Sequence, residues 1–152
     1  MSFSLIIFDL DFTLWNAGGT WCDNTSPPYR QVNNHVVDSE NNTLFLYPNV
    51  HSILAELNKE YLLAVASRTY QPQWARELMQ LFHIHSYFSY FEIYPLSKTE
   101  HFHHLQHQSQ IPYLEMLFFD DEMRNVDEVA QLGVTTVLVD EGITQEMIDR
   151  HL

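Results

Sequence analysis

Short apolar runs alternate with amphipathic stretches along most of this chain. Residues 5–8, 62–66 and 116–119 are continuously apolar, which is typical of strands buried on both faces of a sheet. Between the runs, apolar residues recur at helical spacing. We expect further strands near 91–94 and 134–139. We expect helices around 50–57, 74–81, 102–105 and 126–132, and a short helix at the end of the chain.

Alternation of strands and helices predicts an α/β fold with a mostly parallel central sheet, right-handed crossovers and helices on both faces. Residues 15–46 interrupt this pattern because they are polar, rich in turn residues and without periodicity. We interpret 15–46 as a flap inserted into a single domain that spans residues 1–152. Its aromatic residues Trp15, Trp21 and Tyr29 are expected to anchor the flap to the body, with lining of a pocket as the alternative.

Composition excludes several classes of protein. The chain has 152 residues and a net charge of −13, with seven Lys and Arg against twenty Asp and Glu, which argues against nucleic acid or anionic membranes as partners. Cys22 is the single cysteine, so no intrachain disulfide forms. The first residues do not resemble a signal peptide and no apolar stretch is long enough to span a bilayer. We therefore expect a soluble cytoplasmic protein.

The first apolar run leads directly into Asp9-Leu10-Asp11-Phe12-Thr13. Two carboxylates so close together repel each other and are costly to bury unless a cation or a shared proton compensates. The pattern therefore indicates a metal site, although a polar strand end with an Asx turn is the simpler alternative. An EF-hand calcium loop is excluded because Leu14 and Thr20 occupy the positions that require Gly and Glu.

Polar residues also follow the later predicted strands. They are Ser67 and Arg68 after the second strand, Lys98 after the third, and Asp120, Asp121 and Asn125 after the fourth. Because the carboxyl ends of parallel strands share one edge of a sheet, we expect these side chains to meet there with Asp9 and Asp11.

Phosphoryl transfer is the chemistry that these residue types suit. Asp9 would be the nucleophile and form an aspartyl-phosphate, and Asp11 would protonate the leaving oxygen and then activate water. Ser67, with Thr13 as a further candidate, would donate hydrogen bonds to the phosphoryl oxygens. Lys98 would offset the negative charge.

Magnesium prefers oxygen ligands and usually takes one or two carboxylates together with water and phosphate. Asp9 and Asp121 would supply the carboxylates. Asp120 is expected behind them, beside Lys98, and Asn125 lies one helical turn further on. Arg68 is either a clamp for the substrate or a member of a salt bridge.

In this order, the residues resemble the haloacid dehalogenase superfamily, and within it the small magnesium-dependent phosphatases of the acid phosphatase and protein-tyrosine phosphatase-like kind. The resemblance is carried by these segments: 8–15, Ser26-Pro27-Pro28-Tyr29, Leu46-Tyr47-Pro48, 66–69, 92–95, Ser97-Lys98, His101-Phe102, 118–122 and 132–134. The flap matches poorly except at Pro27-Pro28.

The resemblance implies a three-layer Rossmann-like fold in which a short flap replaces a large cap. It implies Asp9 as nucleophile and Asp11 as acid and base. The implied magnesium ligands are Asp9, Asp121 and the backbone carbonyl of Asp11. It also implies a phosphotyrosine substrate or a phosphorylated small molecule, such as a sugar or fructosamine phosphate. A catalytically idle binding protein with an acidic partner surface is the alternative function.

Four histidines crowd residues 101–107, and His103 and His107 have the i, i+4 spacing of some zinc sites. Only Glu100 is near enough in sequence to add a ligand. We therefore expect this helix to present a solvated histidine face rather than a metal site.

Overall fold

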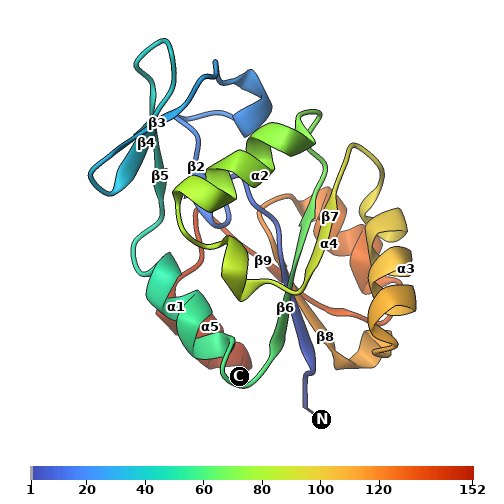
Figure 1. Cartoon of the computed structure of the whole chain (residues 1–152). Helices are drawn as coiled ribbons and strands as arrows, with labels where there is room; N and C mark the ends of the chain where they lie inside the picture. Colours follow the sequence, from blue (N-terminus) through green and yellow to red (C-terminus); the bar gives the residue numbers. More distant parts are fainter. Residues whose placement is uncertain (1) are drawn as a thin grey trace.

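A parallel sheet of five strands forms the centre of the computed structural model, which describes residues 2–152 (Figure 1). The sheet has the order β7-β6-β1-β8-β9. Its strands are β1 (Leu5–Phe8), β6 (Leu62–Ser67), β7 (Tyr90–Ile93), β8 (Met116–Asp120) and β9 (Thr135–Leu138). The chain thus builds outward on one side of β1 and then crosses to the other side, which creates a crevice at the carboxyl end of β1.

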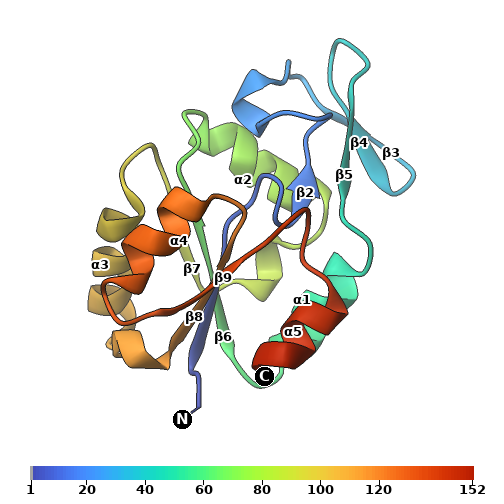
Figure 2. The ribbon, with the colours of Figure 1, turned by 180° about the vertical axis from the view of Figure 1, so that it is seen from behind.

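Helices cover both faces of this sheet (Figures 1 and 2). They are α1 (Val50–Leu57), α2 (Pro72–Leu81), α3 (Lys98–Ser109), α4 (Met123–Ala130) and α5 (Gln145–His151). Apolar residues of α1, α2 and α5 share one core cluster with one face of the sheet, and those of α3 and α4 share a second cluster with the other face. The predicted three-layer α/β fold is confirmed. In residues 2–152, no helix has the length and apolar character needed to cross a membrane.

Strand β1 explains why a continuous apolar run indicates a strand that is buried on both faces. Ile6 and Phe8 point into one core cluster, Leu5 and Ile7 point into the other, and all four are fully buried. The strand pairs with β6 on one side and with β8 on the other. A strand enclosed in this way has no solvent-facing position, so every residue of it is apolar.

The segment that was expected to be irregular contains a second, antiparallel sheet with the order β2-β5-β4-β3. Its strands are β2 (Trp15–Asn16), β3 (Arg30–Val32), β4 (His35–Val37) and β5 (Thr43–Leu46), and a short 3-10 helix, η1 (Cys22–Asn24), follows β2. Strands of two to four residues are too short to show an alternating pattern, so they could not be predicted from the sequence.

Helix boundaries and the histidine face differ from expectation at particular residues. Helix α4 ends at Ala130, two residues ahead of the predicted end at residue 132. His101 is fully buried: its Nε2 donates to the carbonyl oxygen of Tyr94 at 3.0 Å, and burial lowers its pKa to about 3. His104 lies 3.1 Å from the buried carboxylate of Glu92. The expectation of a solvated histidine face is therefore wrong for His101.

Two remote segments fix the turn that follows β1. Phe12 has a φ of 63°, and its carbonyl accepts a hydrogen bond from the N–H of Gly142 at 2.9 Å. The next N–H, of Ile143, donates to the carbonyl of Thr13, and the N–H of Tyr47 donates to that of Leu14. The conformation of the Asp11 turn therefore depends on the chain after β9 and on the end of β5.

Replacing Gly142 by Ala is expected to disturb this turn. The residue has a φ of +74°, and a Cβ there would lie 2.4 Å from Cγ of the buried Tyr47 ring. We expect Gly142→Ala to lower the free energy of unfolding by roughly 2–4 kcal/mol, from backbone strain together with overpacking. Urea denaturation measures this change.

Gly19→Ala is the matched control because Gly19 has a φ of +86° and no atom within 4 Å of its added Cβ. It is expected to cost about 1 kcal/mol, from backbone strain alone. Equal losses for the two variants would show that contact with the Tyr47 ring contributes nothing.

Candidate active site

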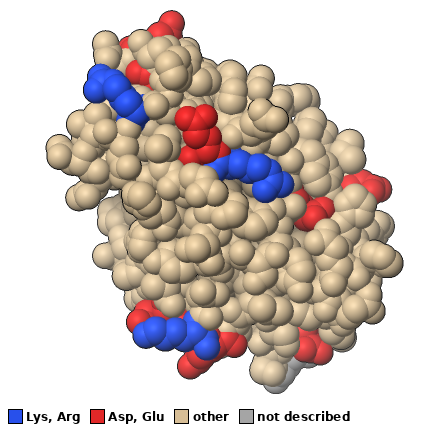
Figure 3. All heavy atoms as spheres, viewed as in Figure 1, with Lys and Arg blue, Asp and Glu red and all other residues tan. Residues whose placement is uncertain are grey.

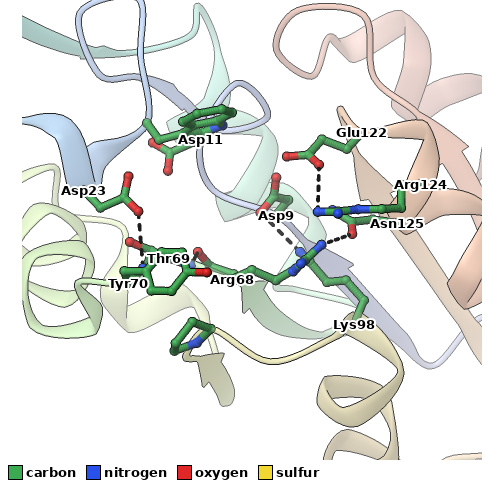
Figure 4. Close-up of a pocket in the computed structure, with 13 residues that line it drawn as sticks. Asp9, Asp11, Asp23, Arg68, Thr69, Tyr70, Lys98, Glu122, Arg124 and Asn125 are labelled. Atoms are coloured by element: carbon green, nitrogen blue, oxygen red, sulfur yellow. Dashed lines mark hydrogen bonds and ion pairs between the residues drawn. The ribbon is translucent and has the colours of Figure 1, made fainter.

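The carboxyl ends of the central strands surround one pocket of about 310 Å³ (Figure 4). Of the residues predicted from the sequence, those that line it are Asp9, Asp11, Ser67, Arg68, Lys98 and Asn125. They come from the end of β1 and the turn after it, from β6 and its following loop, from α3 and from α4. The parallel topology thus brings together side chains that are far apart in sequence.

Lys98 lies at the first position of α3, directly after its N-cap Ser97, and is fully buried. Its Nζ donates to Oδ1 of Asp9 at 3.2 Å and to the carbonyl oxygen of Ala66 at 2.5 Å, and it lies 3.0 Å from Oδ2 of Asp120. Burial by itself would lower the pKa of Lys98, but the two carboxylates outweigh it and raise the pKa above its ordinary value. Lys98 therefore stays charged.

Three carboxylates gather beside this ammonium group. Asp9, Asp120 and Asp121 each offer an oxygen, and these oxygens lie within 4.8 Å of one another. Burial raises the pKa of Asp9 well above its ordinary value, with Asp120 and Asp121 adding to the rise and Lys98 opposing it. Burial also raises the pKa of Asp121 to about 6. One ammonium group does not balance three carboxylates, so the cluster fits a hard divalent cation with oxygen ligands.

Asp120 makes more contacts with donor groups of the protein than Asp9 or Asp121 does. Its Oδ1 accepts from the N–H of Glu122 at 2.8 Å, and its Oδ2 accepts from Nδ2 of Asn125 at 3.1 Å as well as facing Lys98. The other end of the Asn125 amide accepts from the Arg68 guanidinium at 3.1 Å. Asn125 thus connects the buried charge cluster to the arginine at the pocket wall.

Asp11 has its own surroundings, separate from the carboxylate cluster. Its Oδ1 accepts from the indole Nε1 of Trp15 at 2.7 Å and from the backbone N–H of Cys22 at 2.9 Å. Burial raises the pKa of Asp11 to about 7, and these hydrogen bonds oppose the rise. Asp11 can therefore carry or release a proton near neutral pH.

Three predicted site residues, Thr13, Asp120 and Asp121, lie outside the lining of the pocket. Thr13 is fully buried, and its hydroxyl has no hydrogen-bond partner within residues 2–152. The structure does not bring it to the pocket, because the turn after β1 directs it inward. Asp121 belongs to the carboxylate cluster beside Asp9 but not to the pocket wall.

Several lining residues were not found from the sequence: Trp21, Asp23, Thr69, Tyr70, Pro95, Glu122 and Arg124. Thr69 and Glu122 directly follow a predicted site residue and Arg124 directly precedes one, and for these three that adjacency was the available signal. Trp21 and Asp23 come from the flap, which has no periodicity. The expectation that Trp21 anchors the flap is wrong, since it is 51% exposed and lines the pocket, whereas Trp15 and Tyr29 are buried.

Positive charge is concentrated at this pocket. Arg68, Lys98 and Arg124, three of the seven Lys and Arg residues, line it. On the face drawn in Figure 3, basic side chains are few, separated from one another and close to acidic ones. Four carboxylates line the same pocket, Asp9, Asp11, Asp23 and Glu122, so a bound cation would add to the attraction that these basic groups offer an anionic ligand.

Comparisons with known proteins agree on one family. Residues 2–152 match the model of a family described as Acid Phosphatase. Magnesium-dependent phosphatase 1 of Homo sapiens is 38% identical over 151 residues, which cover 97% of this chain and 84% of that protein. A HAD-like hydrolase superfamily protein of Schizosaccharomyces pombe is 36% identical over 144 residues, which cover 86% of this chain and 81% of the relative.

Solved structures share the fold at lower identity. A HAD family enzyme of Bacteroides thetaiotaomicron, in complex with magnesium and inorganic phosphate, superposes with a TM-score of 0.71 at 14% identity and covers 97% of this chain and 99% of its own. A haloacid dehalogenase-like hydrolase of Streptococcus pneumoniae gives a TM-score of 0.69 at 15% identity, covering 97% of this chain and 90% of its own.

Lys98→Met is expected to lower the free energy of unfolding by about 3 kcal/mol at neutral pH, because it leaves buried carboxylates without their counter-charge. Urea denaturation gives the value. Lys59→Met is the control, since Lys59 pairs with Glu56 at the surface with 67% of its side chain exposed. The control is expected to cost less than about 1 kcal/mol. Equal costs for the two variants would contradict charge balance at Lys98.

Proposed function

Because this chain belongs to the acid phosphatase family of the haloacid dehalogenase superfamily and is a magnesium-dependent phosphatase, we propose that it hydrolyses phosphomonoesters through an aspartyl-phosphate on Asp9. The observation that carries the proposal is the pairing of two differently held carboxylates at one pocket. Asp9 contacts the Lys98 ammonium group, whereas Asp11 contacts only neutral donors. Such a difference in surroundings suits a nucleophile beside an acid.

Asp9 is the proposed nucleophile. A carboxylate oxygen of Asp9 attacks phosphorus, and the bond from phosphorus to the ester oxygen breaks. Lys98 favours the ionised form of Asp9, since its ammonium group opposes the effect of burial on the Asp9 pKa. The same ammonium group reduces the repulsion between the carboxylate and an approaching phosphate dianion.

Asp11 is the proposed acid in the first step and base in the second. Its pKa of about 7 allows it to protonate the departing ester oxygen near neutral pH. The resulting carboxylate then accepts a proton from the water that attacks the aspartyl-phosphate. The proton that leaves in the first step is thereby replaced in the second, and Asp11 returns to its starting state.

Ser67 and Arg68 are the proposed groups for the phosphoryl oxygens. Ser67 lies at the end of β6 with its hydroxyl facing the N–H of Thr69 at 3.3 Å, and both residues line the pocket. Arg68 is held by Asn125, which favours its role as a clamp over a role in a salt bridge. Thr13 is not part of this proposal because it does not line the pocket.

Three residues are proposed to hold magnesium: Asp9 and Asp121 through their carboxylates, and Asp11 through its backbone carbonyl. A bound magnesium ion supplies positive charge that offsets the carboxylates and the phosphate. Asp120, which is occupied by Lys98 and Asn125, is proposed to orient these groups rather than to ligate the ion.

Phosphotyrosine and sugar or fructosamine phosphates are the proposed substrates. Two aromatic residues that line the pocket are exposed: Trp21 of the flap is 51% exposed, and Tyr70 of the loop after β6 is 75% exposed. Flat aromatic faces of this kind suit a phenyl or sugar ring next to the phosphate. The pocket of about 310 Å³ leaves room for such a ring.

Phosphate release from a panel that includes phosphotyrosine and hexose phosphates tests the reaction. We expect release to require magnesium, to stop with a chelator, and to fall by on the order of 10⁴-fold or more in Asp9→Asn, since the nucleophile is removed. Asp127→Asn, a change at an exposed carboxylate of α4, should keep the activity of the unchanged protein. Normal turnover by Asp9→Asn would overturn the mechanism, and no turnover of any compound would favour the binding protein.

Chemical trapping tests the covalent intermediate directly. Borohydride reduces an acyl phosphate but not a free carboxylate, so brief treatment during turnover should convert position 9 to homoserine. Mass spectrometry of the peptide that contains residue 9 measures the conversion. With p-nitrophenyl phosphate, whose leaving group departs with little need of the acid, the Asp11→Asn variant should accumulate more of the trapped form, because it lacks the base for the second step. Reduction at no aspartate, with turnover intact, would indicate direct attack by water.

A further inference from the structure

Both N–H groups that donate to the carboxyl group of Asp11 bind the same oxygen. The indole Nε1 of Trp15 and the backbone N–H of Cys22 donate to Oδ1, at 2.7 Å and 2.9 Å. Within residues 2–152, no N–H group donates to Oδ2, and Asp11 lines the pocket. We propose that Trp15 and the N–H of Cys22 are positioning groups that keep the Asp11 proton on Oδ2, facing the substrate. This inference rests on the proposed role of Asp11 as the acid.

The position of the proton follows from the number of lone pairs on each carboxyl oxygen. An oxygen that accepts two N–H hydrogen bonds has both of its lone pairs engaged, so it does not also carry the acid proton without losing a bond. The proton of neutral Asp11 is therefore on Oδ2. When a carboxylate oxygen of Asp9 bonds to phosphorus, the electron pair of the broken P–O bond goes to the ester oxygen. That oxygen takes its proton from Oδ2 of Asp11.

Trp15 is held rigidly enough for this task. It is fully buried in β2, its N–H donates to the carbonyl of Leu10, and its own carbonyl accepts from the N–H of Phe12. Its ring packs against that of Phe82 with 5.8 Å between the centroids. The indole N–H is thus fixed by the same turn that carries the carboxyl group it contacts.

The second donor comes from the flap. Cys22 is the first residue of η1, its carbonyl accepts from the hydroxyl of Thr25 at 2.6 Å, and its Sγ lies 3.6 Å from Oγ1 of Thr69 after β6. The N–H of Cys22 is therefore fixed relative to the edge of the central sheet. Residues of the flap complete the surroundings of the acid, in addition to covering the pocket.

Leaving groups distinguish positioning of an acid from general support of the fold. Phenyl phosphate and p-nitrophenyl phosphate have rings of similar size, but nitrophenolate departs with much less need of a proton than phenolate does. The ratio kcat/KM includes the steps up to formation of the aspartyl-phosphate and excludes the later attack by water. A misplaced acid therefore lowers kcat/KM for phenyl phosphate more than for p-nitrophenyl phosphate.

The sharpest variant replaces the Trp15 indole by benzothiophene, through incorporation of 3-benzothienylalanine, because sulfur removes the N–H donor while the shape is kept. Trp15→Phe serves as a second variant. We expect kcat/KM for phenyl phosphate to fall about tenfold or more, and that for p-nitrophenyl phosphate by less than about threefold, with KM little changed for both.

Phe82→Leu is the control, since it reduces packing against the Trp15 ring but removes neither hydrogen bond to Asp11. It should change kcat/KM for the two substrates by equal factors. Equal losses in the benzothiophene variant, or no loss at all, would overturn the positioning role. Normal turnover by Asp9→Asn would instead overturn the proposed mechanism, so the two failures are separable.

Discussion

The buried ammonium group of Lys98 is the interaction on which the site depends. It lies against Asp9, Asp120 and the carbonyl of Ala66, and so it joins three neighbouring strands of the sheet at their carboxyl ends. Each buried carboxylate would be costly without it. One ammonium group leaves the cluster short of positive charge, and this deficit favours a divalent cation, which would in turn offset the negative charge of a phosphate. The same imbalance that makes the site costly to fold makes it able to bind its cofactor.

The turn after β1 shows how the rest of the chain serves that cluster. Asp9 ends a strand enclosed on both sides, so its position is set by the sheet. Asp11 lies two residues further on, where no strand holds it, and its turn is fixed instead by hydrogen bonds from Gly142, Ile143 and Tyr47. The two carboxylates are thus positioned by different parts of the molecule. This separation allows their surroundings to differ although they are two residues apart: Asp9 faces the charged Lys98, whereas Asp11 accepts from neutral donors.

Elements and site residues could be predicted from the sequence where a local pattern or the parallel topology positions them. The apolar runs identified β1, β6 and β8, because strands buried on both faces cannot carry polar residues. Parallel topology then brought Asp9, Ser67 and Lys98 to one edge, as expected, and their roles in the reaction stay predictions. The flap strands were missed because they are too short for a period to develop. Burial of His101 was missed because its partner, the Tyr94 carbonyl, belongs to a loop whose path no local pattern reveals.

The flap combines two tasks that a large cap would carry out as a separate domain. Trp21 and Asp23 face the pocket, and Cys22 between them donates its N–H to Asp11. The segment 21–23 therefore presents side chains to the pocket and a backbone donor to the proposed acid. Since neighbouring residues share one backbone, a shift of this turn that accommodates a different substrate would also move the donor at Cys22. Under the proposed mechanism, substrate choice and acid positioning would thereby be coupled, and changes of specificity through the flap would be constrained by the need to keep Asp11 in place.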